Sequence, residues 1–211
     1  MTDSERMNKG LLYDPVVSEL MEEQMRCQEL MYEFNSLPPS DIEAQQHLMK
    51  EMFAECGDNN FIQRPLYANW GGRHVHLGSN IYMNFNITLV DDGHIYIGDW
   101  AKFGPNVTIA TPGHPILPEL RRGHVLQYNK DVHIGAGVWI GAGTVVAPGV
   151  TIGDNSVIGA GSVVVRDIPA NVVAVGNPCK VIREIGSRDR KYFFRDEEID
   201  WEEVAEKYGR D

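Results

Sequence analysis

Residues 134–167 read IGAGVW-IGAGTV-VAPGVT-IGDNSV-IGAGSV-VVRD, and this stretch decides the fold. An aliphatic residue recurs at every sixth position: Ile134, Ile140, Val146, Ile152, Ile158 and Val164. Another compact side chain follows four residues after each of the first five: Val138, Thr144, Val150, Ser156 and Ser162. A period of six fits neither an α-helix nor an alternating strand. It predicts a mainly β protein, a parallel β-helix in which each hexapeptide forms one side of a coil.

The repeat extends upstream, where it is interrupted twice. Six earlier positions should also point inward: Leu77, Met83, Leu89, Ile97, Phe103 and Ile109. Asp91-Asp92-Gly93 breaks the count, and the last three of these positions are two residues out of phase with the first three. Residues 110–133 then lose the period over about two dozen residues, and a loop of that length between ordered coils is usually functional. Such breaks are either tolerated bulges or places where loops build a site.

Composition limits the partners and the compartment. A net charge of −11 argues against a general nucleic-acid or anionic-membrane surface. No apolar run approaches the roughly 20 residues of a membrane span, and the N-terminal residues lack the apolar core of a signal peptide. The three cysteines, Cys27, Cys56 and Cys179, are odd in number, which argues against a disulfide framework. We therefore expect a cytoplasmic protein without nucleic-acid or membrane partners.

The chain divides into three expected segments. Residues 1–57 should form an N-terminal helical hairpin, which is too short to fold well alone. Residues 58–178 should form the β-helix, with a catalytic loop at 110–133. Residues 179–211 are highly charged and should form a tail with one short helix.

Local signals place the ends of the helices. Asp14 is a plausible N-cap with Pro15 in the first turn, and residues 40–43, Ser-Asp-Ile-Glu, form a predicted capping box for a second helix. The apolar side of the tail helix should comprise Trp201, Val204 and Tyr208. Since an open solenoid needs its ends covered, we expect the tail to act as a packing element or end cover.

Residues 10–41, GLLYDPVVSELMEEQMRCQELMYEFNSLPPSD, carry a specific resemblance. They resemble the N-terminal segment of the maltose/galactoside O-acetyltransferase family, with a Tyr-Asp-Pro start, a Glu-Phe-Asn helix end and paired prolines. The resemblance covers nearly all of residues 11–186. It implies a left-handed β-helix, acetyl transfer from acetyl-CoA to the hydroxyl of a sugar or similar small acceptor, and a homotrimer with its sites at subunit boundaries.

His114 is the expected general base. It stands in Thr111-Pro112-Gly113-His114-Pro115, the motif that carries the catalytic base in the family that the chain resembles. A neutral imidazole can take a proton near pH 7, and a hydroxyl needs such a base to attack a thioester. Because no cysteine or serine stands in a comparable motif, we expect direct transfer without a covalent acyl-enzyme.

The same resemblance implies the remaining site residues. Substrate-binding positions are Asp14, Asn69, Tyr82 and Asp92. Cofactor-binding positions are Asn84, Trp139, Ala142, Ala160, Val165, Arg166, Lys180 and Arg183. An amide such as Asn84 could donate to an oxyanion, small alanines admit the pantetheine arm, and basic side chains suit the phosphates of CoA. One-residue insertions near 70–73 and 123–131 depart from the family pattern and leave the identity of the acceptor open.

Two other functions remain open from the sequence. Some trimeric β-helix proteins resemble carbonic anhydrases, which bind zinc between subunits through three histidines. The histidines available for such a site are His76, His94, His114, His124 and His133. If the protein is an acetyltransferase, we expect no metal in its site. A non-catalytic trimeric scaffold is the second alternative, since a fold does not determine a function.

Overall fold

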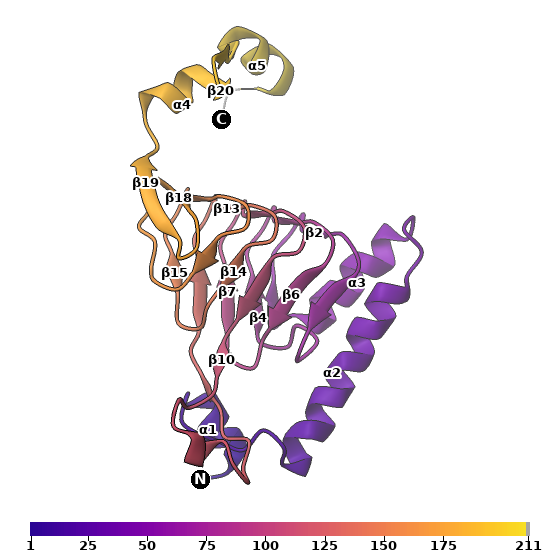
Figure 1. Ribbon diagram of the computed structural model, residues 1–211. Coiled ribbons are helices and arrows are strands. Elements are labelled where there is room, and N and C mark those ends of the chain that lie inside the picture. Colours follow the sequence, from indigo (N-terminus) through magenta and orange to yellow (C-terminus); the bar gives the residue numbers. More distant parts are fainter. Residues whose placement is uncertain (210–211) are drawn as a thin grey trace.

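Three parallel sheets form the sides of a coil in the computed structural model, which describes residues 1–209 (Figure 1). We name each sheet after its first strand. The β1 sheet contains β1 (Glu55–Cys56), β4 (Val75–Leu77), β7 (Ile95–Ile97), β12 (Val132–Ile134) and β15 (Thr151–Ile152). The β2 sheet contains β2 (Phe61–Ile62), β5 (Tyr82–Met83), β8 (Lys102–Phe103), β13 (Trp139–Ile140), β16 (Val157–Ile158), β18 (Val172–Val175) and the antiparallel edge strand β19 (Lys180–Glu184). The β3 sheet contains β3 (Leu66–Ala68), β6 (Ile87–Val90), β9 (Thr108–Ala110), β14 (Val145–Val146) and β17 (Val163–Val164).

The hexapeptide pattern is confirmed residue by residue. The twelve predicted aliphatic or aromatic inward positions, from Leu77 to Val164, are all 3% exposed or less. The compact positions between them are buried as well, including the hydroxyls of Thr144, Ser156 and Ser162. Each strand pairs with the strand one coil away, so identical positions stack along the axis, and the interior is filled by side chains. The predicted parallel β-helix is therefore the observed fold.

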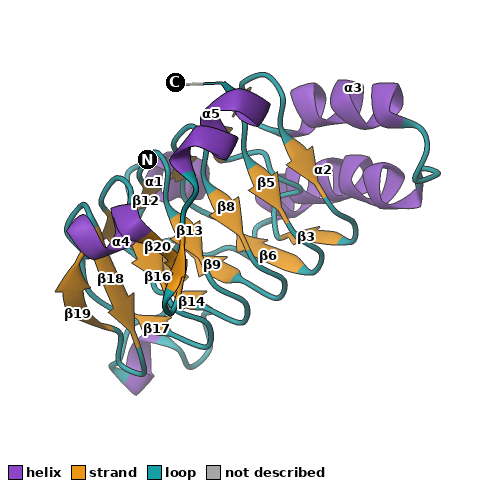
Figure 2. Cartoon of the chain, turned by 90° about the horizontal axis from the view of Figure 1, so that it is seen from above, coloured by secondary structure: helices purple, strands orange, loops and turns teal. Residues whose placement is uncertain are grey.

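The N-terminal helices cover the first coil. Helix α2 (Ser18–Ser36) and helix α3 (Ile42–Met52) lie side by side at one end of the coil (Figures 1 and 2). Phe34 from α2 and Met49 from α3 belong to the same buried cluster as the coil interior. A further helix, α1 (Asp3–Asn8), was not predicted, and it begins with a capping box between Thr2 and Glu5.

Two predicted helix starts are wrong. Helix α2 begins at Ser18 after Val17, not at Asp14-Pro15, and the Asp14 carboxylate accepts the backbone N–H of Val16 instead. The reason lies upstream, because the backbone of Tyr13 pairs with Gln127 and keeps this segment extended. The N-cap of α3 is Asp41 rather than Ser40, and its side chain accepts from the backbone N–H of Ala44.

The long interruption forms a stem with a projecting tip. Strands β10 (Pro112–Gly113) and β11 (Tyr128–Asn129) pair antiparallel, and the 3₁₀ helix η1 (Pro118–Leu120) lies between them. The stem leads toward α1 (Figure 1). Met7, Tyr13, Leu20 and Trp70 form a second buried cluster on this side of the molecule.

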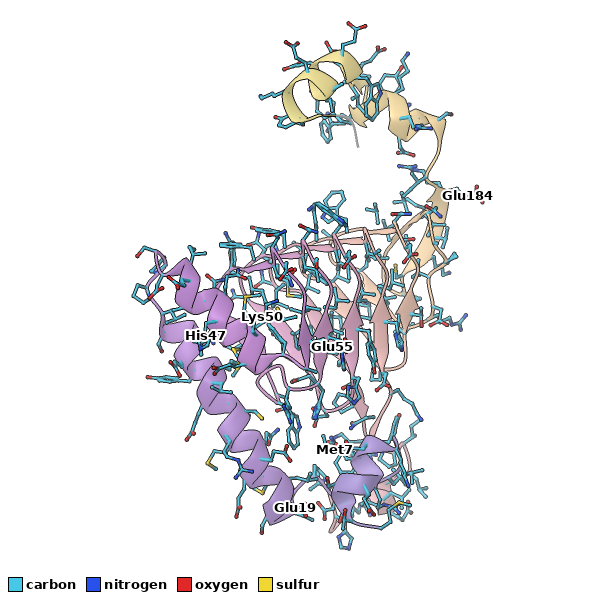
Figure 3. The ribbon with its side chains drawn as sticks, turned by 180° about the vertical axis from the view of Figure 1, so that it is seen from behind. Met7, Glu19, His47, Lys50, Glu55 and Glu184 are labelled. Atoms are coloured by element: carbon cyan, nitrogen blue, oxygen red, sulfur yellow. The ribbon has the colours of Figure 1, made fainter. Side chains whose placement is uncertain are left out.

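The C-terminal tail stands clear of the coil in the single chain (Figures 1 and 3). It contains helix α4 (Ser187–Lys191), the hairpin β20 (Tyr192–Phe194) and β21 (Glu197–Glu198), and helix α5 (Trp201–Tyr208). The predicted helix is thus present, but Trp201 is 56% exposed and Tyr208 is 73% exposed, so its apolar side is not buried here. Glu184 marks the neck where the chain leaves the last coil (Figure 3). Within residues 1–209, none of the helices is long and apolar enough to cross a membrane.

Candidate functional site

The predicted site residues gather at two corners of the coil. The first, which we call the loop corner, lies where the β3 sheet turns toward the β1 sheet and carries the 110–133 loop. The second, which we call the small-residue corner, lies where the β2 sheet turns toward the β3 sheet. The four residues of β6 separate the two corners on one coil, about 13 Å at the rise of a β-strand.

His114 follows β10 directly and projects from the loop corner with an exposed side chain. Its Nδ1 lies 2.9 Å from the carbonyl oxygen of Leu126. A carbonyl oxygen can only accept, so Nδ1 carries the proton in the neutral ring and Nε2 keeps its lone pair. The fold therefore holds the imidazole in the tautomer that a general base requires at Nε2.

Asp92 lies beside this loop and is only 6% exposed. Its Oδ2 accepts from Asn69 Nδ2 at 2.8 Å, and its Oδ1 accepts from Gln127 Nε2 at 2.9 Å. Its backbone carbonyl accepts from Asn129 Nδ2 at 2.8 Å. The structure thus brings together two predicted residues, Asn69 and Asp92, and adds two that the sequence analysis missed, Gln127 and Asn129.

Tyr13 is the third residue that the sequence analysis did not assign to the site. It is 1% exposed, its hydroxyl donates to Asn129 Oδ1 at 3.4 Å, and the same oxygen accepts from the amide of Gln127. Burial, followed by the negative charge of Asp92, raises the pKa of Tyr13 to about 12. The phenol therefore stays protonated near neutral pH and serves as an anchor rather than a base. In the sequence, only its position in the Tyr-Asp-Pro motif could have indicated that Tyr13 belongs to the site.

Asp91 fixes the turn that presents Asn69. Its buried carboxylate accepts from the backbone N–H of Trp70 at 2.7 Å and from that of Gly72 at 3.0 Å. Burial raises the pKa of Asp91 to about 6, against the lowering effect of these hydrogen bonds. The backbone carbonyl of Asp91 also pairs with Nδ1 of His74 at 2.6 Å, and burial lowers the pKa of that imidazole.

Two predicted acceptor residues make no hydrogen bond to Asp92 within residues 1–209. Asp14 is half-buried, and its Oδ2 lies 3.8 Å from Nδ1 of His124 in the 110–133 loop. Tyr82 is on the outer face of the β2 sheet, where its ring stacks on Phe61 with centroids 6.1 Å apart. Tyr82 therefore belongs with the small-residue corner rather than with the loop corner.

The small-residue corner holds Ala142 and Ala160 in one column along the axis, and Asn84 lies in the neighbouring column with Gly104 and Gly141. A Cβ added to Gly104 would lie 2.6 Å from the backbone nitrogen of Ala142, and one on Gly141 would lie 2.5 Å from that of Ala160. Glycine is thus required for the coils to pack this closely. Asn84 Oδ1 accepts from the N–H of Phe85, and within residues 1–209 its Nδ2 has no acceptor.

The other predicted cofactor residues lie around these corners. Trp139 is exposed on the β2 sheet, in register with Tyr82 through Lys102. Val165 and Arg166 follow β17 and are exposed at the loop-corner side of the last full coil. Lys180 and Arg183 are on β19 at the same end of the molecule.

Arg183 already has a partner in the tail. Its two terminal nitrogens each lie 2.7 Å from a carboxylate oxygen of Asp189. The hydrogen bond with Asp189 raises the pKa of Arg183, and the same contact lowers the pKa of Asp189 to about 2. A phosphate would have to share or displace this carboxylate to reach the guanidinium.

The histidines of the zinc alternative do not converge within the chain. His76 and His94 lie side by side with Nε2 and Nδ1 2.8 Å apart, and Tyr96 stacks between His76 and His133. His114 and His124 are in the loop instead. Among residues 1–209, no three His, Cys, Asp or Glu side chains are arranged to hold a metal ion.

Known proteins are similar to this chain over both its capping helices and its repeats. The family model "maltose acetyltransferase hexapeptide capping motif" matches residues 6–57, and "bacterial transferase hexapeptide (six repeats)" matches residues 131–166. Galactoside O-acetyltransferase of Escherichia coli K12 is 48% identical over 200 residues, covering 95% of this chain and 98% of the relative. The enzyme of the same name from Lactococcus lactis is 50% identical over 198 residues, covering 94% and 95%.

A solved structure agrees over almost the whole chain. Galactoside acetyltransferase in complex with coenzyme A superposes with a TM-score of 0.90 at 48% identity, covering 95% of this chain and 99% of that one. The coil, the capping helices and the sequence thus match one group of enzymes together. The chain belongs to the maltose/galactoside O-acetyltransferase family of hexapeptide-repeat acyltransferases.

Proposed function

We propose that this protein transfers the acetyl group of acetyl-CoA to a hydroxyl of a sugar or similar small acceptor, with His114 as general base. The observation that carries the proposal lies at the loop corner, where the Leu126 carbonyl accepts from Nδ1 of His114 and leaves the lone pair of Nε2 available. The next residue of the same loop, Gln127, donates to the carboxylate of Asp92. The names of the relatives, galactoside O-acetyltransferases, support a sugar as the acceptor.

The reaction needs a base, an oxyanion donor and a leaving-group acid. His114 Nε2 removes the hydroxyl proton while the oxygen attacks the thioester carbonyl carbon. The developing oxyanion accepts a hydrogen bond from the free amide of Asn84. When the tetrahedral intermediate collapses, the carbon–sulfur bond breaks and the thiolate takes the proton from the imidazolium of His114. No acyl-enzyme forms in this sequence of steps.

Acceptor binding is assigned to Asp14, Asn69, Tyr82 and Asp92. Carboxylate and amide groups suit hydroxyl recognition, because a carboxylate oxygen has lone pairs beyond those that Asn69 and Gln127 use. The cofactor side is assigned to Asn84, Trp139, Ala142, Ala160, Val165, Arg166, Lys180 and Arg183. Acetyl-CoA carries the acetyl group, and no metal takes part in the proposed steps.

The two corners require a second copy of the chain. On its own coil, Asn84 is separated from the loop corner by about the length of strand β6. The side chains of Asn84 and His114 from one chain are therefore too far apart to reach the same reacting carbon. A homotrimer with threefold symmetry can place the small-residue corner of one chain against the loop corner of the next. Each of its three sites would then combine His114 from one chain with Asn84 from a neighbour.

Release of the CoA thiol tests the proposal. Purified protein is incubated with acetyl-CoA and a panel of sugars and small alcohols, and His114→Ala is measured in parallel. We expect turnover with at least one hydroxyl acceptor and a loss of about 10²–10⁴-fold in kcat for the variant, at an unchanged unfolding midpoint because the side chain is exposed. Undiminished turnover by His114→Ala would rule out this base.

A further inference from the structure

Gln127 connects the two halves of the proposed acceptor site. Its side-chain amide contacts Asp92, while the peptide immediately before it, through the Leu126 carbonyl, contacts His114. Its backbone N–H and C=O both pair with Tyr13, each at 3.0 Å. One residue of the interrupted region is therefore tied to the general base, to the acceptor carboxylate and to the N-terminal segment.

The orientation of the Gln127 amide follows from its partners. Both contacts of the side chain are made by Nε2, one to the carboxylate of Asp92 and one to the hydroxyl of Tyr13. The pKa of Tyr13 is about 12, so the phenol remains a neutral group that can accept from the amide and donate to Asn129. Among residues 1–209, nothing donates to Oε1. The NH₂ group is thus held on the Asp92 side.

Burial makes this arrangement costly to break. Gln127 and Asp92 are both 6% exposed, and Tyr13 is 1% exposed. A hydrogen bond to a charged group contributes more than one between neutral groups, and a buried carboxylate that loses a donor is poorly compensated by water. No basic side chain pairs with Asp92 within residues 1–209. Its position therefore depends on the two neutral amides of Asn69 and Gln127.

We propose that Gln127 is a positioning residue for acceptor recognition: anchored on Tyr13, it fixes the carboxylate of Asp92 in register with the general base His114. This inference rests on the proposed function, because it takes Asp92 as the group that binds the acceptor hydroxyl. It adds a residue from the loop that departs from the family pattern, and it gives Tyr13 a role in the site. Gln127 does not touch the reacting atoms.

The main test separates the acceptor from the cofactor. Gln127→Leu keeps the size of the side chain and removes the amide. We expect the KM for the acceptor to rise about tenfold or more, with the KM for acetyl-CoA unchanged. The matched control is Gln45→Leu, which removes another buried glutamine amide, whose Nε2 donates to the carbonyl of Ile62 and contacts none of the loop-corner residues. The control should lower the unfolding midpoint and leave both KM values unchanged.

A variant that can ionise at position 127 should make acceptor kcat/KM depend on pH, which a general packing defect would not do. Gln127→Glu places a second carboxyl beside Asp92, and of two adjacent carboxylates one has a raised pKa. When that carboxyl is protonated it can donate to Asp92, so binding is restored at low pH. The acceptor kcat/KM of Gln127→Glu, divided by that of the wild type at each pH, should fall as pH rises through that raised pKa.

Tyr13→Phe completes the series. Removal of the phenol hydroxyl frees one N–H of Gln127 and should raise the acceptor KM about two- to fivefold, in the same direction but by less than Gln127→Leu. An unchanged acceptor KM in folded Gln127→Leu, or a flat pH ratio for Gln127→Glu, overturns the positioning role while the wild-type activity stands. Absence of wild-type transfer to every hydroxyl acceptor would instead overturn the proposed function, and the inference with it.

Discussion

The regular coil and the loop corner of this protein are built in opposite ways. In the coil, each side chain has the same role as the residue one coil away, and the backbone hydrogen bonds repeat along the axis. At the loop corner, Tyr13, Asn69, Asp92 and Gln127 come from four separate segments, and side-chain hydrogen bonds join them. The regular coil therefore depends on repeated packing, whereas the loop corner, where we propose the general base, depends on side-chain hydrogen bonds between separate segments.

The largest effect on stability should come from the coil. Ile152 is fully buried on β15, away from both corners. Ile152→Ala should lower the free energy of unfolding by about 2–5 kcal/mol, because it removes buried methyl groups and leaves a cavity. Chemical denaturation measures this loss, and the acceptor KM of the folded fraction should not change. A shifted KM would show that packing at β15 affects acceptor recognition.

The buried turn beneath the loop corner should show a pH-dependent stability. Folding raises the pKa of Asp91 from 3.8 to about 6, so the folded state binds this proton more tightly than the unfolded state. This contribution to stability is complete below pH 3.8 and is lost as pH rises toward 6. It amounts to at most about 3 kcal/mol at 1.36 kcal/mol per pH unit.

The control for this effect is Asp91→Asn, which cannot ionise. The difference in unfolding free energy between the wild type and Asp91→Asn should favour the wild type more at pH 4 than at pH 7. Parallel pH profiles for the two proteins would show that the carboxyl of Asp91 does not change its proton affinity on folding.

The smallest expected effect is that of a chelator. Neither the coil nor the loop corner supplies three convergent metal ligands within residues 1–209. Treatment with EDTA should leave turnover unchanged. Metal analysis of the purified protein should find no stoichiometric zinc. Loss of turnover that added zinc restores would support the alternative of a histidine-bound zinc site between subunits.

The fold could be predicted from the sequence because its information is local and repeated. Every hexapeptide carries the same inward pattern, so Ile134 and Ile158 could be assigned without knowledge of their neighbours in space. The helix start at Asp14 could not, because a pairing with Gln127, more than a hundred residues away, keeps that segment extended. Propensity at a helix end is a weak signal compared with a tertiary contact.

The candidate site was predictable only in part. The motif around His114 and the break at Asp91-Asp92 were visible in the sequence. In the structure, the side-chain amide of Asn69 donates a hydrogen bond to the carboxylate of Asp92. Gln127 and Asn129 lie in a loop without a repeat, so nothing in the sequence showed which of its polar side chains point inward. Asn84 and His114 are separated within one chain, so only the family resemblance, and not local spacing, pointed to a shared site at a subunit boundary.

Mixed assemblies test whether each site combines residues of two neighbouring chains. His114→Ala and Asn84→Ala should each be strongly impaired, because one lacks the proposed base and the other the proposed oxyanion donor. When the two variants are co-expressed and assemble at random, about a quarter of the sites between neighbours in a trimer should combine an intact His114 with an intact Asn84. Acetyl-CoA turnover should then recover to about this fraction of the wild-type rate. Mixed oligomers that form and remain as inactive as either parent would contradict this prediction.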